Sequence, residues 1–168
     1  DSEHPLYGRE IVKVTIGRLD RNRAAEYLKK GFAQLKIEVS DREIEEAENE
    51  LDGLIGWLTL YGYEKGVKKS KDALGKTSQS AARIAASELV HFFKKVKNKK
   101  LYLSILRNVN GTGWEELRAL SSKDYGKKLN NNLFAFVLER LLGYSFVEKK
   151  DQKYYLSDPL LAKAIFLV

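Results

Sequence analysis

The sequence predicts a mainly α-helical protein: a helical bundle followed by a winged helix-turn-helix domain that contains a small β-hairpin. Apolar residues recur at helical spacing through most of residues 20–97. Three shorter helical segments follow, and FVEKKDQKYYL then reads as two short strands around a polar turn. Three helices and a hairpin in this order describe a winged helix-turn-helix. We therefore expect a strand over residues 1–19, a helical domain over 20–97 and a winged helix-turn-helix domain over 98–168.

The first elements have recognisable starts. EIVKVTIGRL alternates as a strand, and Asp20 then caps a helix, RNRAAEYLKKGFAQL, whose apolar residues share one face. Ser40 and Glu43 have the spacing of a capping box, so a second helix is expected after Ser40. The next segment, DGLIGWLTLYGYEKGVKK, is apolar and interrupted by glycines, which predicts a third helix with a closely packed beginning.

The later elements follow from the same periodicities. A long helix is expected over about residues 71–97, and shorter ones at KKLYLSILRNV, at residues 114–120 and at residues 127–142. The two strands of FVEKKDQKYYL come next. A final helix from about Pro159 should close the core of the last domain.

Composition excludes several classes of function. The chain has 168 residues, 43% of them apolar, which is enough for one good core or two small ones. There is no Cys and there are only two His, so disulfide frameworks and thiolate metal sites are excluded and a His-rich metal site is not expected. No apolar run is long enough to span a membrane and no signal peptide opens the chain, so we expect a cytoplasmic protein without a membrane partner. Because the chain begins with Asp1 and contains no Met, we expect a processed protein or a piece of a longer one.

The stretch SKDALGKT, residues 70–77, ends in the Gly-Lys-Thr of a phosphate-binding loop. Such a loop also needs a glycine at its start, and it must run from a buried strand into a helix. Here Ser70 takes the place of the first glycine, and the preceding residues are charged. An apolar strand ending in magnesium-binding acids is also missing. We therefore interpret Lys76 and Thr77 as ordinary residues near the start of the long helix.

Three separated stretches resemble a known family. HPLYGREIVKV, GLIGWLTLYG and FVEKKDQKYYLSDPLLAKAIF occur here in the order found in the C-terminal part of archaeal ATPases of the AAA+/STAND class. Those proteins carry a helical lid and a winged helix after a P-loop core. The resemblance implies that residues 1–19 are a remnant strand of that core, and that the segments binding ATP and Mg²⁺ lie upstream of Asp1. It implies ATP and Mg²⁺ for the full-length protein, whereas this chain alone should bind neither and should not hydrolyse ATP.

The resemblance also implies roles for particular residues. Arg9, in PLYGR, is the candidate arginine that senses or neutralises the γ-phosphate, a role that a planar, permanently charged guanidinium suits. The alternative is a structural arginine that caps the following strand. Gly53, Ile55, Gly56 and Trp57 match the lid segment that approaches the nucleotide, with Ile55 in place of the family's proline; for Trp57 the alternative is simple packing.

The charge distribution points to a polyanionic partner for the second half of the chain. Residues 1–70 carry 12 Lys and Arg against 14 Asp and Glu, whereas residues 71–168 carry 18 against 9. Around the predicted recognition helix and wing we select as DNA-binding candidates Lys123, Lys127, Lys128, Asn130, Asn131, Asn132, Lys149, Lys150 and Lys153. Arginine, the better reader of guanine, is nearly absent from these positions, so a protein-docking or purely structural winged helix remains the alternative.

Two functions are therefore open. In the first, the lid couples an upstream ATPase core in the same polypeptide to a winged helix that binds duplex DNA or a protein partner, or that mediates self-association. In the second, the chain is a free-standing winged-helix module for DNA binding or protein interaction, without any role for nucleotide.

Overall fold

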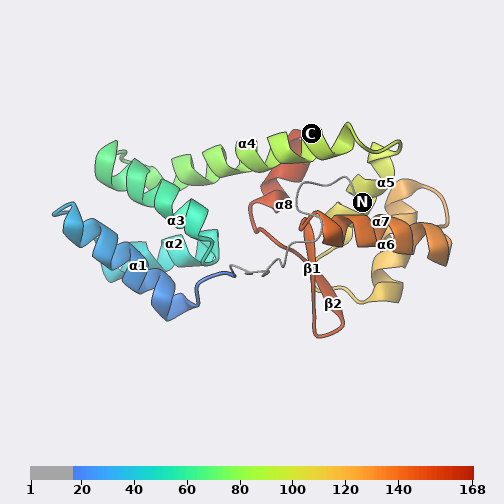
Figure 1. The fold of residues 1–168 in the computed structure, drawn as a ribbon, viewed down its shortest axis with the longest axis horizontal. Coiled ribbons are helices and arrows are strands. Elements are labelled where there is room, and N and C mark those ends of the chain that lie inside the picture. The colour runs from blue at the N-terminus through green and yellow to red at the C-terminus, as the bar shows by residue number, and fades with distance from the viewer. Residues whose placement is uncertain (1–16) are drawn as a thin grey trace, which may run out of the picture.

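The computed structural model describes residues 17–168, and this part of the chain is mainly helical with one small antiparallel hairpin (Figure 1). The α-helices are α1 (Arg21–Gln34), α2 (Asp41–Leu51), α3 (Ile55–Gly62), α4 (Ala73–Phe93), α5 (Lys99–Asn108), α6 (Trp114–Tyr125), α7 (Asn131–Gly143) and α8 (Leu161–Ala164). The strands are β1 (Val147–Lys150) and β2 (Lys153–Leu156); a π-helical turn η1 (Tyr63–Val67) follows α3, and a 3₁₀ turn η2 (Ile165–Leu167) follows α8. No helix in the described residues could cross a membrane.

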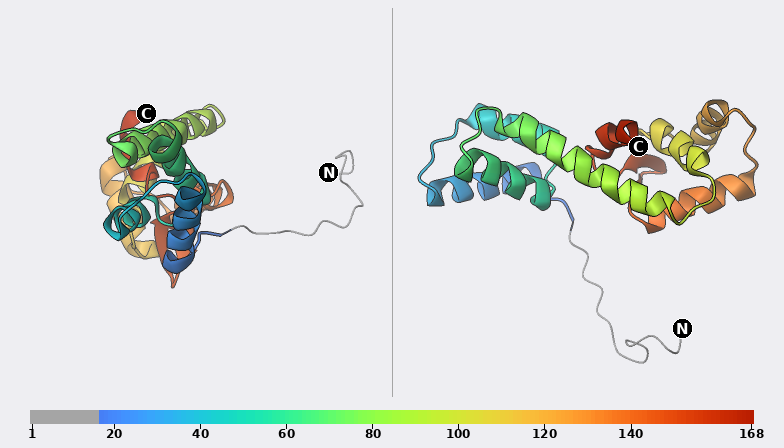
Figure 2. Two further views of the ribbon diagram at one scale, coloured as in Figure 1. Left: turned by 90° about the vertical axis from the view of Figure 1, so that its left-hand side faces the viewer. Right: turned by 90° about the horizontal axis from the view of Figure 1, so that it is seen from above.

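Helices α1 to α3 pack together at one end of an elongated molecule (Figures 1 and 2). Both expected N-terminal caps are present: the Asp20 carboxylate accepts from the Arg23 backbone N–H at 2.9 Å, and Ser40 and Glu43 form the capping box. The buried residues of these helices form one hydrophobic cluster with the start of α4 and one residue before α8: Ala24, Leu28, Phe32, Ile44, Ala47, Leu51, Leu58, Tyr61, Ala73, Ala81 and Leu160. This cluster is the first core.

Helix α4 runs along the molecule and contributes to two cores (Figure 2). Ala73 and Ala81, in its first half, belong to the first core. Its second half, from Ala85 to Phe93, packs into a second core with α5, α6, α7 and the hairpin. Helix α4, which lies before residue 97, supplies apolar side chains to both cores. The cores therefore do not divide the chain at residues 97/98, and the expected domain boundary there stays a prediction.

The second core is closed by the hairpin. Strand β1 pairs with β2 in antiparallel register, with Val147 opposite Leu156. The α5–α6 connection adds a short extended segment, because Gly111 N–H donates to Tyr154 O at 2.8 Å and Tyr154 N–H donates to Thr112 O at 2.9 Å. The sequence prediction of two strands around a polar turn is thus confirmed.

Some boundaries differ from the expectation. The helix predicted from residue 127 begins at Asn131, because Gly126 ends α6 in the left-handed conformation (φ 82°) and Asn130 caps α7 through its side chain. The final helix is only α8, followed by η2. Most of the strand expected over residues 1–19 lies outside the described residues, and so does Arg9.

Candidate functional site

The structure separates the predicted site residues into two places. Gly53 lies in the turn between α2 and α3, and Ile55 to Trp57 form the first turn of α3, beside the end of the segment that leads in from the N-terminus. One set of lysines and the asparagines lie around the α6–α7 turn, at the other end of the molecule, and the remaining lysines lie on the hairpin, nearer its middle (Figure 1). The role predicted for Arg9 stays a prediction, since that residue lies outside residues 17–168.

Gly53 is shaped for close approach to the protein's own backbone. Asp52 and Gly53 both have positive φ, 51° and 66°, and the Gly53 carbonyl accepts from the Leu19 N–H at 2.9 Å. A Cβ on Gly53 would lie 2.1 Å from the Leu19 carbonyl oxygen, well inside van der Waals contact. By contrast, a Cβ on Gly56 would meet no atom within 4 Å. Of the two glycines, only Gly53 is required by the backbone.

Trp57 connects the first core to the segment after the hairpin. Its indole N–H donates to the Asp158 carboxylate at 2.8 Å, and the other oxygen of that carboxylate accepts from the Leu160 N–H at 2.8 Å. The contact spans 101 positions of sequence, so no local pattern could have revealed it. The packing interpretation of Trp57 therefore has a direct structural basis.

A pocket of about 420 Å³ opens at the start of α3. It is lined by Leu54, Ile55, Gly56, Trp57, Glu88, Tyr144, Ser145, Phe146, Ser157, Asp158 and Leu161. Its charged lining residues, Glu88 and Asp158, are both acids. The aromatic rings could stack on a nucleotide base, whereas phosphate oxygens would be repelled by the carboxylates. Phosphates approaching this end of α3 would therefore need cations from another part of the protein.

Arg18 joins the entering segment to α2 and to the hairpin. Its guanidinium pairs with Asp52, the residue that ends α2, at 3.2 Å, and with Glu148 on β1 at 3.0 Å. It also donates to the Ser157 carbonyl at 2.5 Å. Sequence reasoning missed this residue, because its partners on β1 and beyond lie 130 and 139 positions away. Planar Arg can hold several acceptors at once, which makes it suited to such a junction.

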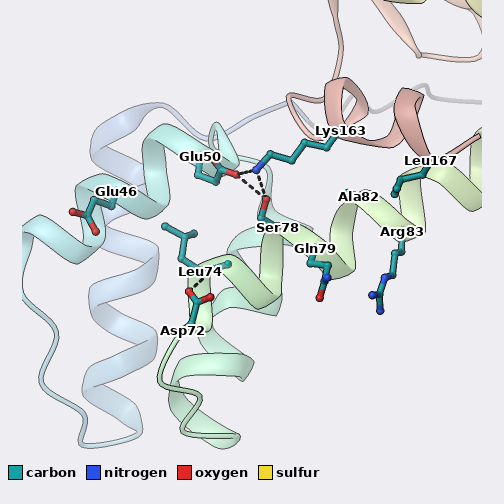
Figure 3. Close-up of a pocket in the computed structure, with 11 residues that line it drawn as sticks. Glu46, Glu50, Asp72, Leu74, Ser78, Gln79, Ala82, Arg83, Lys163 and Leu167 are labelled. Atoms are coloured by element: carbon teal, nitrogen blue, oxygen red, sulfur yellow. Dashed lines mark hydrogen bonds and ion pairs between the residues drawn. The ribbon is translucent and has the colours of Figure 1, made fainter.

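A larger pocket, of about 660 Å³, lies between α2, α4 and α8 (Figure 3). At its edge the Glu50 carboxylate accepts a hydrogen bond from Ser78 Oγ at 2.7 Å and forms an ion pair with Lys163, which also donates to Ser78 Oγ at 2.6 Å. Burial opposes ionisation of Glu50, but the hydrogen bonds from Lys163 and Ser78 outweigh it and lower the pKa of this carboxyl. The triad thus fastens α8 to α2 and α4.

The Gly-Lys-Thr stretch lies near the start of α4, as predicted. Asp72 caps the helix by accepting from the Gly75 N–H at 3.0 Å. Thr77 is buried, and its hydroxyl donates to the Ala73 carbonyl at 2.8 Å. Lys76 donates to Ser70 Oγ at 3.2 Å. These side chains are engaged in helix packing and capping, and the segment has no strand leading into it.

The predicted DNA-binding residues are all exposed, and they form two groups. One group, Lys123 to Asn132, surrounds the turn before α7, and the other, Lys149 to Lys153, flanks the tip of the hairpin, which extends away from α7 to one side (Figure 1). Within residues 17–168 none of these lysines forms an ion pair. The carboxamide oxygen of Asn130 is already used, since it accepts from the Leu133 N–H at 2.8 Å as the cap of α7.

The solvent face of α7 has an apolar centre that sequence reasoning missed. Leu133 is 41% exposed and Phe136 is 55% exposed, and the Arg140 guanidinium carbon lies 5.7 Å from the centre of the Phe136 ring. Glu139 is exposed on the same helix. The helix is apolar on several sides, so periodicity alone could not separate this outward face from the buried one, which carries Phe134, Val137, Leu138 and Leu141.

Comparisons with known proteins relate the fold of this chain to that of a solved structure. No protein-family model and no curated protein sequence matches it. Among solved structures, it is similar to the Walker-type ATPase PABY2304 of Pyrococcus abyssi, with a TM-score of 0.81 and 29% identity. The match covers 99% of this chain and 47% of the ATPase, so the chain spans about half of that protein's length.

The fold is therefore that of a region of an archaeal P-loop ATPase. The match supports the resemblance noted in the sequence at this coarser level, since residues of this chain align with a Walker-type ATPase over nearly their whole length. The chain has the architecture of an ATPase-associated region that is mainly helical and ends in a small hairpin.

Proposed function

We propose that this chain is the helical lid and winged-helix portion of an archaeal AAA+/STAND-type ATPase, and that it couples the nucleotide state of an upstream core to the binding of an anionic partner. The observation that carries the proposal is the match of 99% of this chain to less than half of a Walker-type ATPase. In the proposed division, residues 20–97, which contain α1 to α4, form the lid, and residues 98–168, which contain α5 to α8 and the hairpin, form the winged helix.

The contacts between the two ends of the chain support the coupling. A displacement of the Leu19–Gly53 hydrogen bond would move the start of α3, and Trp57 would carry that movement to Asp158. Arg18 lies next to the entering segment and holds both Asp52 and Glu148. The signal would therefore pass through packed side chains that join the lid to the hairpin.

In this proposal ATP and Mg²⁺ belong to the core of the full-length protein, where they supply phosphoryl-transfer chemistry. The residues of this chain contribute position and charge. Arg9 is proposed to place its guanidinium near the γ-phosphate, and the segment from Gly53 to Trp57 to close toward the base. The acidic pocket beside Trp57 leaves the phosphates to the core and to Arg9.

The ATPase proposal is tested on the full-length protein. The complete reading frame should contain a strand followed by GxxxxGK[ST] upstream of Asp1, and the protein should hydrolyse ATP. Arg9→Ala should lower kcat at least tenfold with a smaller effect on nucleotide affinity, because the guanidinium acts on charge that develops in the transition state. Unchanged turnover in Arg9→Ala would assign Arg9 to the capping role, and a reading frame that begins at Asp1 would favour the free-standing module.

The lysines of the α6–α7 turn and the hairpin are proposed to attract the anionic partner, which is duplex DNA or an acidic protein. For DNA, the paired substitution Lys127→Ala with Lys128→Ala should weaken retardation of duplex DNA at about 50 mM salt, and salt should weaken the wild type further. Lys29→Ala with Lys30→Ala is the matched control, since both lysines are ion-paired on α1. Equal losses in the two double variants would show only a general effect of net charge.

A further inference from the structure

We infer that the exposed face of α7 around Phe136 docks an acidic, amphipathic helix of a partner protein, rather than the base edges of DNA. The inference deepens the proposed effector role and rests on it only in treating α7 as part of the effector surface. It follows from three properties of this face: its apolar centre, its few groups suited to reading base edges, and the lysines at one end.

The apolar centre consists of two neighbouring side chains. Phe136 and Leu133 are three positions apart, so they lie side by side on the helix, and both are substantially exposed. The Arg140 guanidinium lies over the Phe136 ring, within the range of a cation–π contact. Exposed aromatic and arginine side chains of this kind are enriched among the residues that carry the binding energy of protein interfaces.

The same face is poorly equipped to read DNA. Base edges in the major groove are recognised through hydrogen-bond donors and acceptors. Beyond the first turn of α7, this face offers two apolar side chains, Leu133 and Phe136. It also offers Glu139, which would repel phosphates, and Arg140, whose guanidinium lies against the Phe136 ring. Asn130 uses its amide oxygen as the helix cap. Only Asn131 and Asn132 remain as amides able to read bases.

The lysines near the start of α7 indicate that the partner is acidic. Lys123 lies in the last turn of α6, and Lys127 and Lys128 lie in the turn before α7; all three are exposed and without ion pairs among the described residues. The N-terminus of the helix also carries a partial positive charge. A partner helix with carboxylates at one end and leucine or phenylalanine along one face would satisfy both parts of this surface, because its acids reach the lysines while its apolar side chains cover Phe136 and Leu133.

The test uses the chain as it exists and a synthetic probe. The probe is a fluorescent helical peptide of about 18 residues, with Glu in its first two turns and Leu at i, i+3, i+4 and i+7 spacing. Its binding is measured by anisotropy at about 100 mM salt, in parallel with a labelled 20-bp duplex. Two further peptides serve as specificity controls: one has Glu replaced by Gln, and the other has Leu replaced by Ser.

The expected result is saturable binding of the acidic peptide that Phe136→Ala weakens at least tenfold and that the Gln and Ser peptides lose. Phe136→Ala should leave binding of the duplex within twofold of wild type. Phe166→Ala is the matched control, because Phe166 is a more exposed phenylalanine (80%) on the C-terminal η2 turn, and it should leave peptide binding unchanged. Amide chemical shifts should move along α7 when the peptide is added.

Two results would overturn the inference. The first is loss of duplex binding in Phe136→Ala with no binding of the acidic peptide, which would assign the face to DNA. The second is equal loss of peptide binding in Phe136→Ala and Phe166→Ala, which would indicate non-specific apolar adsorption. None of these readouts involves nucleotide, so failure of the ATPase proposal would be seen separately, in the turnover measurements on the full-length protein.

Discussion

At the scale of single residues, the two glycines of the GLIGWLT block behave as opposites. Gly53 has a positive φ and faces the Leu19 carbonyl, whereas Gly56 lies in α3 with open space around its Cα. Gly53→Ala should therefore lower the free energy of unfolding by about 2 kcal/mol or more, through left-handed strain and a backbone clash. Gly56→Ala should be neutral or stabilise by up to about 1 kcal/mol, because alanine loses less entropy in a helix.

Urea unfolding followed by far-UV circular dichroism would measure both changes. If Gly53→Ala unfolds at the same urea concentration as wild type, the close approach of Leu19 to Gly53 is not a requirement of the fold. The comparison also bears on the site, since Gly53 lies where the segment entering from the proposed core meets the lid.

At the scale of elements, α8 is held to α2 and α4 by the Glu50, Ser78 and Lys163 contacts (Figure 3). The pKa of Glu50 in the folded protein is lowered from its ordinary value of 4.5. The folded state therefore binds fewer protons than the unfolded chain near this pH. The stabilising contribution is complete above about pH 4.5 and is lost as the pH falls through the folded-state pKa.

In Glu50→Gln the unfolding free energy should therefore decrease less than in wild type between neutral pH and about pH 3. Urea unfolding at each pH measures this decrease. Glu45→Gln is the control, because Glu45 is an exposed acid on the same helix with no ion pair in the described residues. If the unfolding free energy of Glu50→Gln falls with decreasing pH as steeply as that of wild type, the contact between Glu50 and Lys163 makes no measurable contribution to stability.

At the scale of the whole molecule, α4 makes the two cores depend on each other. Ile84 lies between the residues that serve the first core and those that serve the second, and it is 46% exposed, so its side chain contributes little. Ile84→Pro should cost about 3 kcal/mol or more by removing a backbone hydrogen bond and kinking the helix, whereas Ile84→Ala should cost little.

The two tryptophans can report the unfolding of the two cores separately. Trp57 packs against the first core and Trp114 against the second. Trp57→Phe and Trp114→Phe each leave one tryptophan, and in an otherwise wild-type chain the two variants should show coincident urea transitions. When Ile84→Pro is added to each variant, the transitions should separate or disappear. Separate transitions in the wild-type background would show instead that the two cores unfold independently and that α4 does not couple them.

Much of the secondary structure could be predicted because its causes are local. The caps at Asp20 and Ser40 and the hairpin around a polar turn depend on residues within a few positions of one another. The start of α7 was predicted four residues too early, since the lysines before it have good helix propensity. The left-handed Gly126 and the Asn130 cap decide that boundary.

The sequence by itself determined a mainly helical chain with a C-terminal hairpin, a basic second half, and a Gly-Lys-Thr stretch without the surroundings of a phosphate loop. It also carried the resemblance to an archaeal P-loop ATPase, which the structural match supports at that level. Only the tertiary structure revealed the Arg18 junction, the bond from Trp57 to Asp158 and the outward position of Phe136. The physical reason is distance along the chain: periodicity and capping act over a few residues, whereas these features depend on packing between helices and strands up to 139 positions apart.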